Sequence, residues 1–236
     1  MEVSKIWGMI DSRCIVFPAR SDGLNALTLM FTTPAELARP FLGGGAYEFV
    51  ESDGGTVDVF VSFHDFTSGD WGPARTFDVC MAVRPIGATA EDDQDGVYLA
   101  EALVNRRFTG EVTYWSLGIS RRVGPIEVGV VGDEVVAVAS EGDGEALRVR
   151  LPAVESPGLT RYSHRAYSYL HREPYVVPFE IDLPHPVVDP ADVQIEVGTG
   201  RIARAMTAIG LPRQPTAVAW GTQMQYTLHA PFPLPT

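Results

Sequence analysis

The side chains best suited to chemistry in this chain include a histidine beside a carboxylate. His64 and Asp65 stand at the end of an alternating segment, where a carboxylate can tune an imidazole for proton transfer. The same pair also suits a structural role in which Asp65 caps the following turn, because turns commonly use aspartate in this way. The sequence favours the structural role and leaves proton transfer by His64 as the alternative.

Two adjacent arginines, Arg121 and Arg122, form a second candidate site. The planar guanidinium fork suits carboxylates and enolates, so one of them could clamp a substrate. The competing interpretation is that an arginine faces solvent or pairs with an acid such as Glu127. We expect residues 114–122 to be extended, and adjacent residues on a strand point to opposite faces. At most one of the two arginines should therefore enter a cavity.

Aromatic side chains accompany these charges. Tyr114 and Trp115 could line an apolar pocket and offer a phenol or indole donor, although alternation predicts that one of them belongs to the core. Residues 161–171 are the most polar-aromatic run in the chain, with Arg161, Tyr162, His164, Arg165, Tyr167, Tyr169 and His171. Because Tyr and Arg are enriched at interfaces, this run favours a contact between the subunits of a homo-oligomer. The alternative is a lid with proton-transfer groups.

Composition narrows the classes of function. The 236-residue chain has a formal net charge of −12, which disfavours binding to nucleic acid or an anionic membrane. It lacks an apolar run of the ~20 residues that a membrane helix needs and the apolar stretch of a secretory signal. Two cysteines, Cys14 and Cys80, are too few for a disulfide scaffold. We therefore expect a cytoplasmic protein.

Motifs for cofactors are missing from the sequence. His185 and His229 stand alone, without metal-ligand spacing to other His, Cys or carboxylate residues, so we predict no metal site. Phosphate-loop, dinucleotide-binding and serine-elbow patterns do not occur. We expect neither a cofactor nor covalent serine or cysteine catalysis.

The elements that must position these residues are mostly strands. Alternating or β-branched runs joined by Gly/Asp turns are typical of antiparallel sheet, and they occupy residues 24–32, 56–64, 77–85, 97–104, 126–131, 134–139, 146–151 and 223–229. Thr33 as N-cap and Pro34 as the first helical residue predict a short helix ending near Arg39. A second helix is expected over residues 202–209. We expect one domain, residues 1–236.

The order of these elements resembles the acetoacetate decarboxylase family over most of the chain. The similarity lies in residues 27–31 with the helix after them, residues 63–69, residues 114–122, and residues 198–209 paired with the last strand. The resemblance implies an α+β, mostly β fold: a closed or cone-like antiparallel β-barrel with a few short helices around an apolar cavity. It also implies that Arg20, His64, Trp71, Arg75 and Trp115 border the substrate.

The same resemblance argues against the reaction for which the family is known, in which a lysine forms an imine with a β-keto acid. The two lysine positions hold Arg121 and Arg122, whose guanidinium groups stay protonated and cannot form that imine. The chain has a single lysine, Lys5, and no glutamate between Glu51 and Glu91. We therefore expect a different chemistry.

Our leading hypothesis is a cofactor-free lyase or cyclase of specialised, polyketide-like metabolism, acting on an apolar keto, enol or polyene substrate with Arg121, Arg122 and Tyr114 as catalytic residues. A dry pocket with an arginine or phenol donor can fold such a substrate and stabilise enol-like charge. One alternative is a non-catalytic ligand-binding or interaction protein on a retired decarboxylase scaffold. Another is an imine formed by Lys5 folding back into the pocket.

Overall fold

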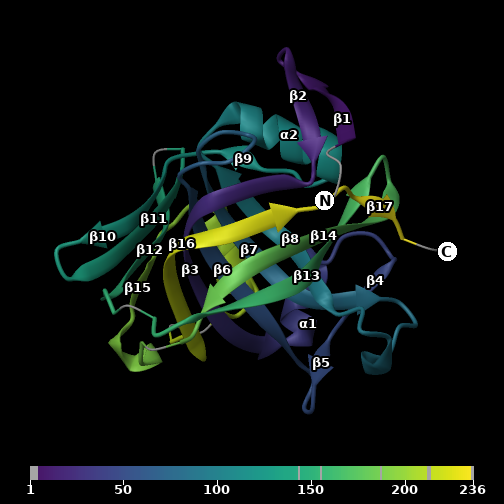
Figure 1. Cartoon of the computed structure of the whole chain (residues 1–236). Coiled ribbons are helices and arrows are strands. Elements are labelled where there is room, and N and C mark those ends of the chain that lie inside the picture. The colour runs from purple at the N-terminus through teal and green to yellow at the C-terminus, as the bar shows by residue number, and fades with distance from the viewer. Residues whose placement is uncertain (1–4, 143, 155, 187, 212–213, 235–236) are drawn as a thin grey trace.

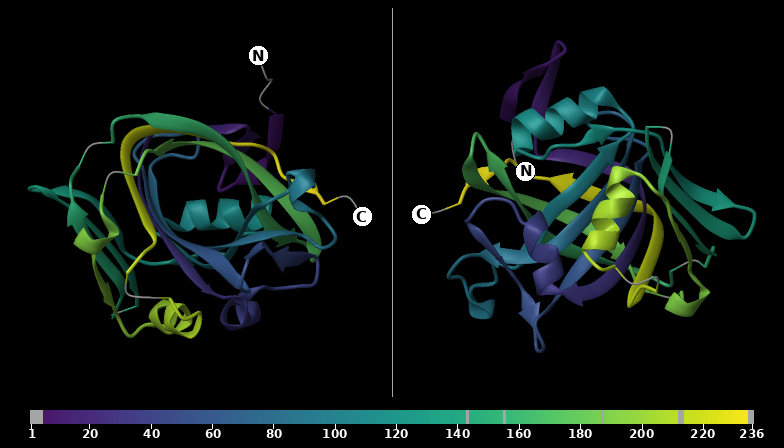
Figure 2. Two further views of the ribbon diagram at one scale, coloured as in Figure 1. Left: turned by 90° about the horizontal axis from the view of Figure 1, so that it is seen from below. Right: turned by 180° about the vertical axis from the view of Figure 1, so that it is seen from behind.

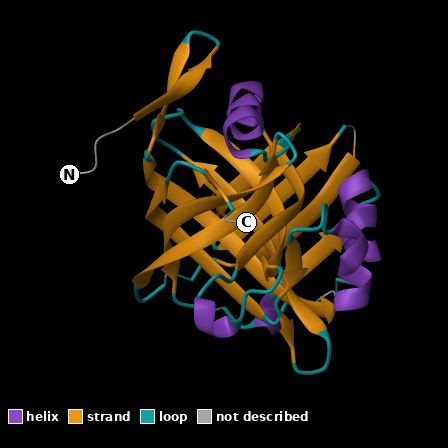
Figure 3. Cartoon of the chain, turned by 90° about the vertical axis from the view of Figure 1, so that its right-hand side faces the viewer, coloured by secondary structure: helices purple, strands orange, loops and turns teal. Residues whose placement is uncertain are grey.

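The computed structural model describes residues 5–142, 144–154, 156–186, 188–211 and 214–234. Most of this part of the chain is β-strand, and the helices lie around the outside of the strands (Figures 1 and 3). Within it, no helix combines the length and apolar character needed to cross a membrane.

The largest sheet is ring-like, because β8 pairs with β7 on one side and with β13 on the other. Its strands, in spatial order, are β7 (Ala74–Pro85), β6 (Thr56–Phe66), β3 (Ala19–Pro34), β16 (Ala217–Leu228), β14 (Glu173–Pro184), β13 (Leu159–Leu170) and β8 (Gly96–Val104). Short strands extend it at β4 (Tyr47–Phe49), β5 (Glu51–Ser52), β9 (Arg122–Val123) and β17 (Phe232–Pro233). Figure 2 shows the ring from below.

The expectation of a wholly antiparallel sheet is wrong at one seam. β13 runs parallel to β8, with Ala166 opposite Val97 and Tyr167 opposite Tyr98, and β9 is also parallel to β8. A parallel pair needs a long crossover connection, and here α2 (Arg107–Leu117) and a second sheet intervene between β8 and β13.

That second sheet has four strands and packs on the outside of the ring. It is formed by β10 (Ile126–Val131), β11 (Glu134–Glu141), β12 (Gly144–Pro152) and β15 (Gln194–Val197). The predicted strands at residues 126–131, 134–139 and 146–151 are confirmed as three consecutive antiparallel strands. The shared core also takes in α3 (Arg201–Ala208), which confirms the predicted second helix within a residue at each end.

Alternation along β6 shows how the ring is built. Val57, Val59, Val61 and Phe63 are fully buried in the core shared with the second sheet, and burying each side chain contributes about 1.5–3 kcal/mol. The alternate residues, from Phe60 to Phe66, point to the opposite face of the strand. The more polar face of β6 therefore lines the inside of the ring.

Four local predictions need correction. Residues 114–122 are not a strand: α2 continues to Leu117 and ends at Gly118, whose φ of 68° is the left-handed conformation that glycine favours. A side chain there would collide with the Tyr169 carbonyl oxygen, so glycine permits the close contact between α2 and β13. The first helix, α1 (Ala35–Ala38), begins after Pro34, not at it.

Thr33 does not cap α1, because its hydroxyl donates to the Ile209 carbonyl oxygen at 2.5 Å. Pro40 does not stop the helical segment near Arg39 either, since η1 (Arg39–Phe41) continues it. The other 3₁₀ turns are η2 (Ala90–Asp92) and η3 (Pro190–Asp192). The N-terminal segment is a hairpin of β1 (Lys5–Ile10) and β2 (Arg13–Phe17) that projects beside α2 (Figure 1).

Candidate functional site

The ring encloses a cavity of about 480 Å³, which lies in the usual range for small-molecule sites. Every strand of the ring contributes side chains to its wall, and α2 contributes Thr109, Thr113 and Leu117. Seen along the ring, α2 lies within its outline (left view of Figure 2). The helix therefore covers one end of the cavity.

Strands β6 and β7 form the polar side of this cavity. His64 Nδ1 lies 3.2 Å from Thr76 Oγ1 and 3.5 Å from the Asp78 carboxylate. Thr76 in turn donates to Asp78 at 3.3 Å. Because the Thr76 hydroxyl donates to Asp78, its oxygen accepts from His64 Nδ1–H. Among the described residues His64 Nε2 has no hydrogen-bond partner, so this tautomer leaves Nε2 as an open acceptor.

Asp78 is held by Arg121 on its other side. Both terminal nitrogens of the guanidinium donate to the two carboxylate oxygens, one of them at 3.2 Å. The Asp78 and Arg121 side chains are only 7% and 10% exposed. Burial acts to raise the pKa of Asp78, but the Arg121 guanidinium and the contact with His64 outweigh it and hold that pKa below its usual value. Asp78 is therefore a carboxylate inside the cavity.

We expect acid to weaken the fold through Asp78. Because its folded pKa is lowered, the stabilisation by the ionised form is present above the unfolded value of about 3.9 and is lost as the pH falls through the folded pKa. Chemical unfolding at pH values from about 6 to 2 measures this loss. The free energy of unfolding of the wild type should fall more on acidification than that of Asp78→Asn, and equal losses would contradict the assignment.

Aromatic rings continue the wall from the polar side, beginning at Phe66, whose ring centroid lies 5.9 Å from that of His64. Tyr226 packs against Phe66 at 5.4 Å and Phe179 at 5.8 Å between ring centroids, and His164 lies between Phe179 and Tyr162. Burial raises the pKa of Tyr226, and Arg121 and Asp78 are close enough to act on it. The phenol therefore keeps its proton at neutral pH and can donate a hydrogen bond. Burial lowers the pKa of His164, which favours its neutral form.

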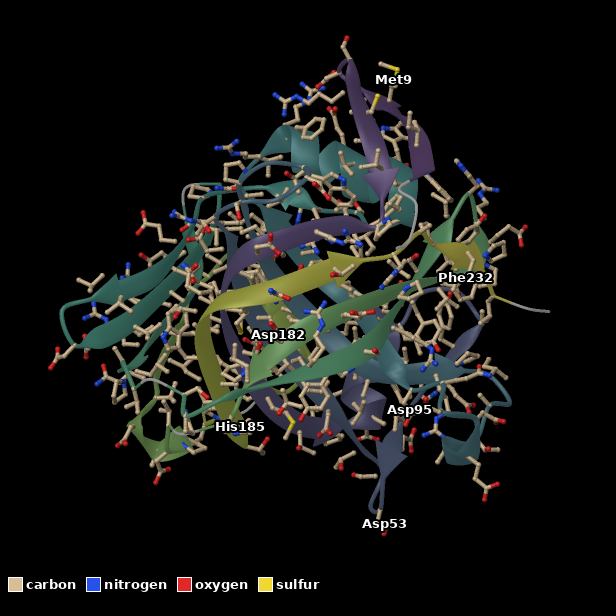
Figure 4. The ribbon with its side chains drawn as sticks, in the orientation of Figure 1. Met9, Asp53, Asp95, Asp182, His185 and Phe232 are labelled. Carbon is tan, nitrogen blue, oxygen red and sulfur yellow. The ribbon has the colours of Figure 1, made fainter. Side chains whose placement is uncertain are left out.

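The loop between β6 and β7 borders the cavity. Asp70 accepts from the Arg20 backbone N–H at 2.9 Å, and the Asp70 N–H donates to the Arg20 carbonyl at 3.0 Å. Trp71 lies behind them against Phe17. His185 lines the other end of the cavity and contacts Thr160 at 2.9 Å. Figure 4 shows His185 at the opposite end of the molecule from the hairpin.

The structure separates the residues that the sequence grouped together. Arg121, His64, Trp71 and Arg20 all line the cavity, with Arg20 at an exposed position. Arg122 does not line it: its guanidinium points the other way and pairs with Glu101 and Glu141. The two arginines thus point to opposite sides, as predicted, although Arg122 pairs with Glu101 and Glu141 and not with Glu127.

Four other predictions about the site are wrong, because the side chains concerned do not lie in the cavity. Tyr114 and Trp115 are 51% and 58% exposed on the outer face of α2, because that segment is a helix and not a strand. Arg75 and Asp65 pair with each other at 3.0 Å on the outer face of the ring, since they alternate with the inward residues. The carboxylate beside His64 is therefore Asp78, not its sequence neighbour.

Sequence reasoning missed Asp78 and Tyr226. Asp78 is an acid within the apolar run of residues 77–83, and a charged residue in a buried strand signals a paired or functional group. Tyr226 carried no comparable signal. Within the described part of the chain, no group of three His, Cys, Asp or Glu side chains gathers as a metal ion would require.

Comparison with known proteins supports a fold and no more. No protein-family model and no curated protein matches the chain. Among solved structures, acetoacetate decarboxylase from Legionella pneumophila aligns with a TM-score of 0.70 at 10% identity, covering 97% of this chain and 93% of that one. An acetoacetate decarboxylase-like enzyme from Sphingomonas wittichii RW1 aligns at 0.61 and 12%, covering 99% and 100%.

The enduracididine biosynthesis enzyme MppR, in complex with pyruvate, aligns with a TM-score of 0.60 at 14% identity, covering 92% of this chain and 90% of that one. Identities this low establish shared architecture and not shared chemistry. The chain has the acetoacetate decarboxylase-like fold.

Proposed function

We propose that the protein is a cofactor-free lyase or cyclase of specialised metabolism, which moves a proton on an apolar keto or enol substrate and forms no Schiff base. The observation that supports it is the contact of His64 with the buried, ionised Asp78 inside an otherwise largely apolar cavity. A histidine oriented by a carboxylate is a common general base. An organic molecule bound in the cavity would lie beside this histidine.

The proposed first step is removal of a proton from a carbon next to a carbonyl group. His64 Nε2 takes the proton, and the electron pair of the broken C–H bond moves into an enolate. Asp78 stabilises the imidazolium that results, and Arg121 keeps Asp78 ionised. The Tyr226 hydroxyl donates to the enolate oxygen, where negative charge develops.

The enolate can then react in two ways, and neither reaction needs a co-reactant. In a cyclisation its carbon forms a bond to a second carbonyl carbon of the same molecule, and that carbonyl oxygen takes the proton back from His64. In an elimination the enolate expels an oxygen substituent at the β-carbon, which leaves with that proton. The first is cyclase chemistry and the second is lyase chemistry.

The sequence and the fold neighbours add support. The single lysine of the chain, Lys5, lies in β1 with its backbone opposite Phe17; its side chain is outside the described part of the structure. Arg121, at a lysine position of the resembling family, uses its terminal nitrogens to hold Asp78. MppR has also been captured with the condensation product of pyruvate and imidazole 4-carboxaldehyde, so this fold can hold a condensation product.

Hydrogen exchange tests this proposal. Methyl benzoylpropionate, a neutral ketone, is incubated with the protein in D₂O, and the loss of its α-proton signal is followed by NMR. The wild type should exchange it faster than buffer does, and Tyr226→Phe should reduce that rate by about 10²–10³-fold, the usual effect of removing one donor to a developing oxyanion. Tyr175→Phe is the matched control, because Tyr175 does not line the cavity.

Borohydride reduction of the same mixture checks the mechanism. We expect no gain in protein mass, since the reaction passes through no imine. A stable adduct on Lys5 would overturn the proposal in favour of imine chemistry. Tight binding of the ketone without any exchange would overturn it in favour of a non-catalytic binding protein.

A further inference from the structure

We propose that the cavity is specific for an uncharged, elongated keto compound that carries its oxygens along one edge and its carboxyl group as an ester. This inference rests on the proposed function of the same cavity and names the substrate class. It differs from what the fold neighbour MppR is seen to hold, which is the small free acid pyruvate.

The charges in the buried part of the wall argue against a free carboxylate there, since the second arginine of the lining, Arg20, is at an exposed position. Arg121 would be the natural partner for one, but both of its terminal nitrogens already donate to Asp78. Asp78 itself is a carboxylate within the same cavity. A second carboxylate nearby would meet repulsion in a medium of low dielectric, as well as the loss of its hydration. Esterification removes both penalties.

Hydroxyl groups on neighbouring strands give the cavity one polar edge. Thr28 lies opposite Ser62 on β3 and β6, and their hydroxyl oxygens are 3.1 Å apart. Ser62 lies opposite Asp78, and Thr76 lies opposite His64. In a hydroxyl pair one group donates to the other, which leaves one O–H and free lone pairs for a guest. Neighbouring strands are about 4.8 Å apart, so the row can meet several oxygens along one chain.

The wall that continues from this row is aromatic. The rings of Tyr162, His164, Phe179 and Tyr226 follow one another along β13, β14 and β16 with centroid separations of 5.6–5.8 Å. Burial favours the neutral form of His164, so this wall presents flat, mostly apolar faces. Its polar exception is the Tyr226 hydroxyl, which is close enough to Asp78 and Arg121 for their charges to act on it and which shares the keto oxygen with the hydroxyl row. A guest with oxygens on one edge and a hydrocarbon face on the other satisfies both walls together.

The volume agrees with a guest of that shape. A cavity of about 480 Å³ suits a drug-sized molecule, whereas a three-carbon acid would leave most of the apolar wall without contacts. An elongated keto ester can contact the polar row and the aromatic rings at the same time. Size and polarity therefore point to the same class of compound.

Three probes of one carbon skeleton test the inference by calorimetry: methyl benzoylpropionate, its free acid benzoylpropionate, and methyl phenylbutyrate, which lacks the keto oxygen. The wild type should bind the keto ester at least about tenfold more tightly than the free acid. It should also bind the keto ester about fivefold to tenfold more tightly than methyl phenylbutyrate, as expected for one hydrogen-bonded oxygen.

Variants of the polar row identify which residues read the oxygen. In Thr28→Val and in Ser62→Ala the preference for the keto ester over methyl phenylbutyrate should fall to about twofold or less. Thr32→Val is the matched control: Thr32 is on the same strand and also contacts β6, through Asp58 at 3.2 Å, but it does not line the cavity. This variant should keep the full preference.

The outcomes separate the two proposals. If the free acid binds as tightly as the ester, or if the row variants keep the oxygen preference, the substrate class is wrong, while α-hydrogen exchange dependent on His64 would still support the proposed function. If no probe binds the wild type, the substrate class is overturned. Loss of α-hydrogen exchange together with intact ester selectivity would overturn the catalytic proposal alone.

Discussion

Replacing His64 with asparagine is expected to slow enzyme-catalysed α-hydrogen exchange of methyl benzoylpropionate by about 10²–10⁴-fold, the usual contribution of a general base. The amide of asparagine can take the place of Nδ1–H and donate to Thr76 or Asp78, but it cannot accept a proton as Nε2 does. The variant therefore removes the base and spares the network around it. Exchange rates in D₂O, followed by NMR, give the ratio.

A matched substitution separates this effect from a general one. His171→Asn exchanges the same side chains at an exposed position with a φ of 55°, where asparagine is well tolerated. Its exchange rate should equal that of the wild type, and both variants should unfold in one cooperative transition. A His64→Asn protein that folds normally and retains the full rate would show that another group takes the proton.

Replacing Arg121 with methionine is expected to destabilise the fold by about 3–5 kcal/mol, because it leaves the buried Asp78 carboxylate without its cationic partner. Denaturant unfolding near neutral pH measures this change. The neighbouring Arg122→Met is the comparison. That side chain is 30% exposed, so solvent compensates part of the loss and its effect should be clearly smaller.

A double substitution shows that the loss comes from the charge pair. Arg121→Met combined with Asp78→Leu removes both charges, and replacing a buried ion pair by apolar side chains is often close to neutral. The double variant should recover most of the stability lost by Arg121→Met alone. A double variant less stable than the single one would mean that Arg121 acts chiefly through its packing and not through Asp78.

The sequence predicted the elements well where their ends are determined by neighbouring residues, such as turn or capping glycines. Gly/Asp turns gave the hairpins of β10, β11 and β12, and Gly200 and Gly210 bracket α3. The extended structure predicted from residue 114 onward is wrong because Tyr114 and Trp115 favour strands by propensity, whereas tertiary packing of the opposite face of α2 decides the outcome. Propensity alone could not reveal that Val112 and Leu117 would be buried against the ring.

The site depends on the packing and the register of the strands, which the alternation of residues along one strand does not reveal. The pattern along β6 defines two faces, but only the second sheet determines that the valine face points outward and that His64 points into the ring. The pairing of His64 with Asp78 follows from the register of β6 on β7, in which Ser62 lies opposite Asp78. Asp65, the nearer carboxylate in sequence, points to the other face and binds Arg75.

The protonation of His64 is the most direct test of the account. In protein labelled with ¹⁵N at histidine, NMR of the neutral imidazole distinguishes a protonated ring nitrogen from an unprotonated one. We predict that Nδ1 carries the hydrogen, held by Thr76 and Asp78, and that Nε2 is free to accept a proton from a guest. The opposite tautomer, with hydrogen on Nε2, would contradict the assignment of His64 as the base of this cavity.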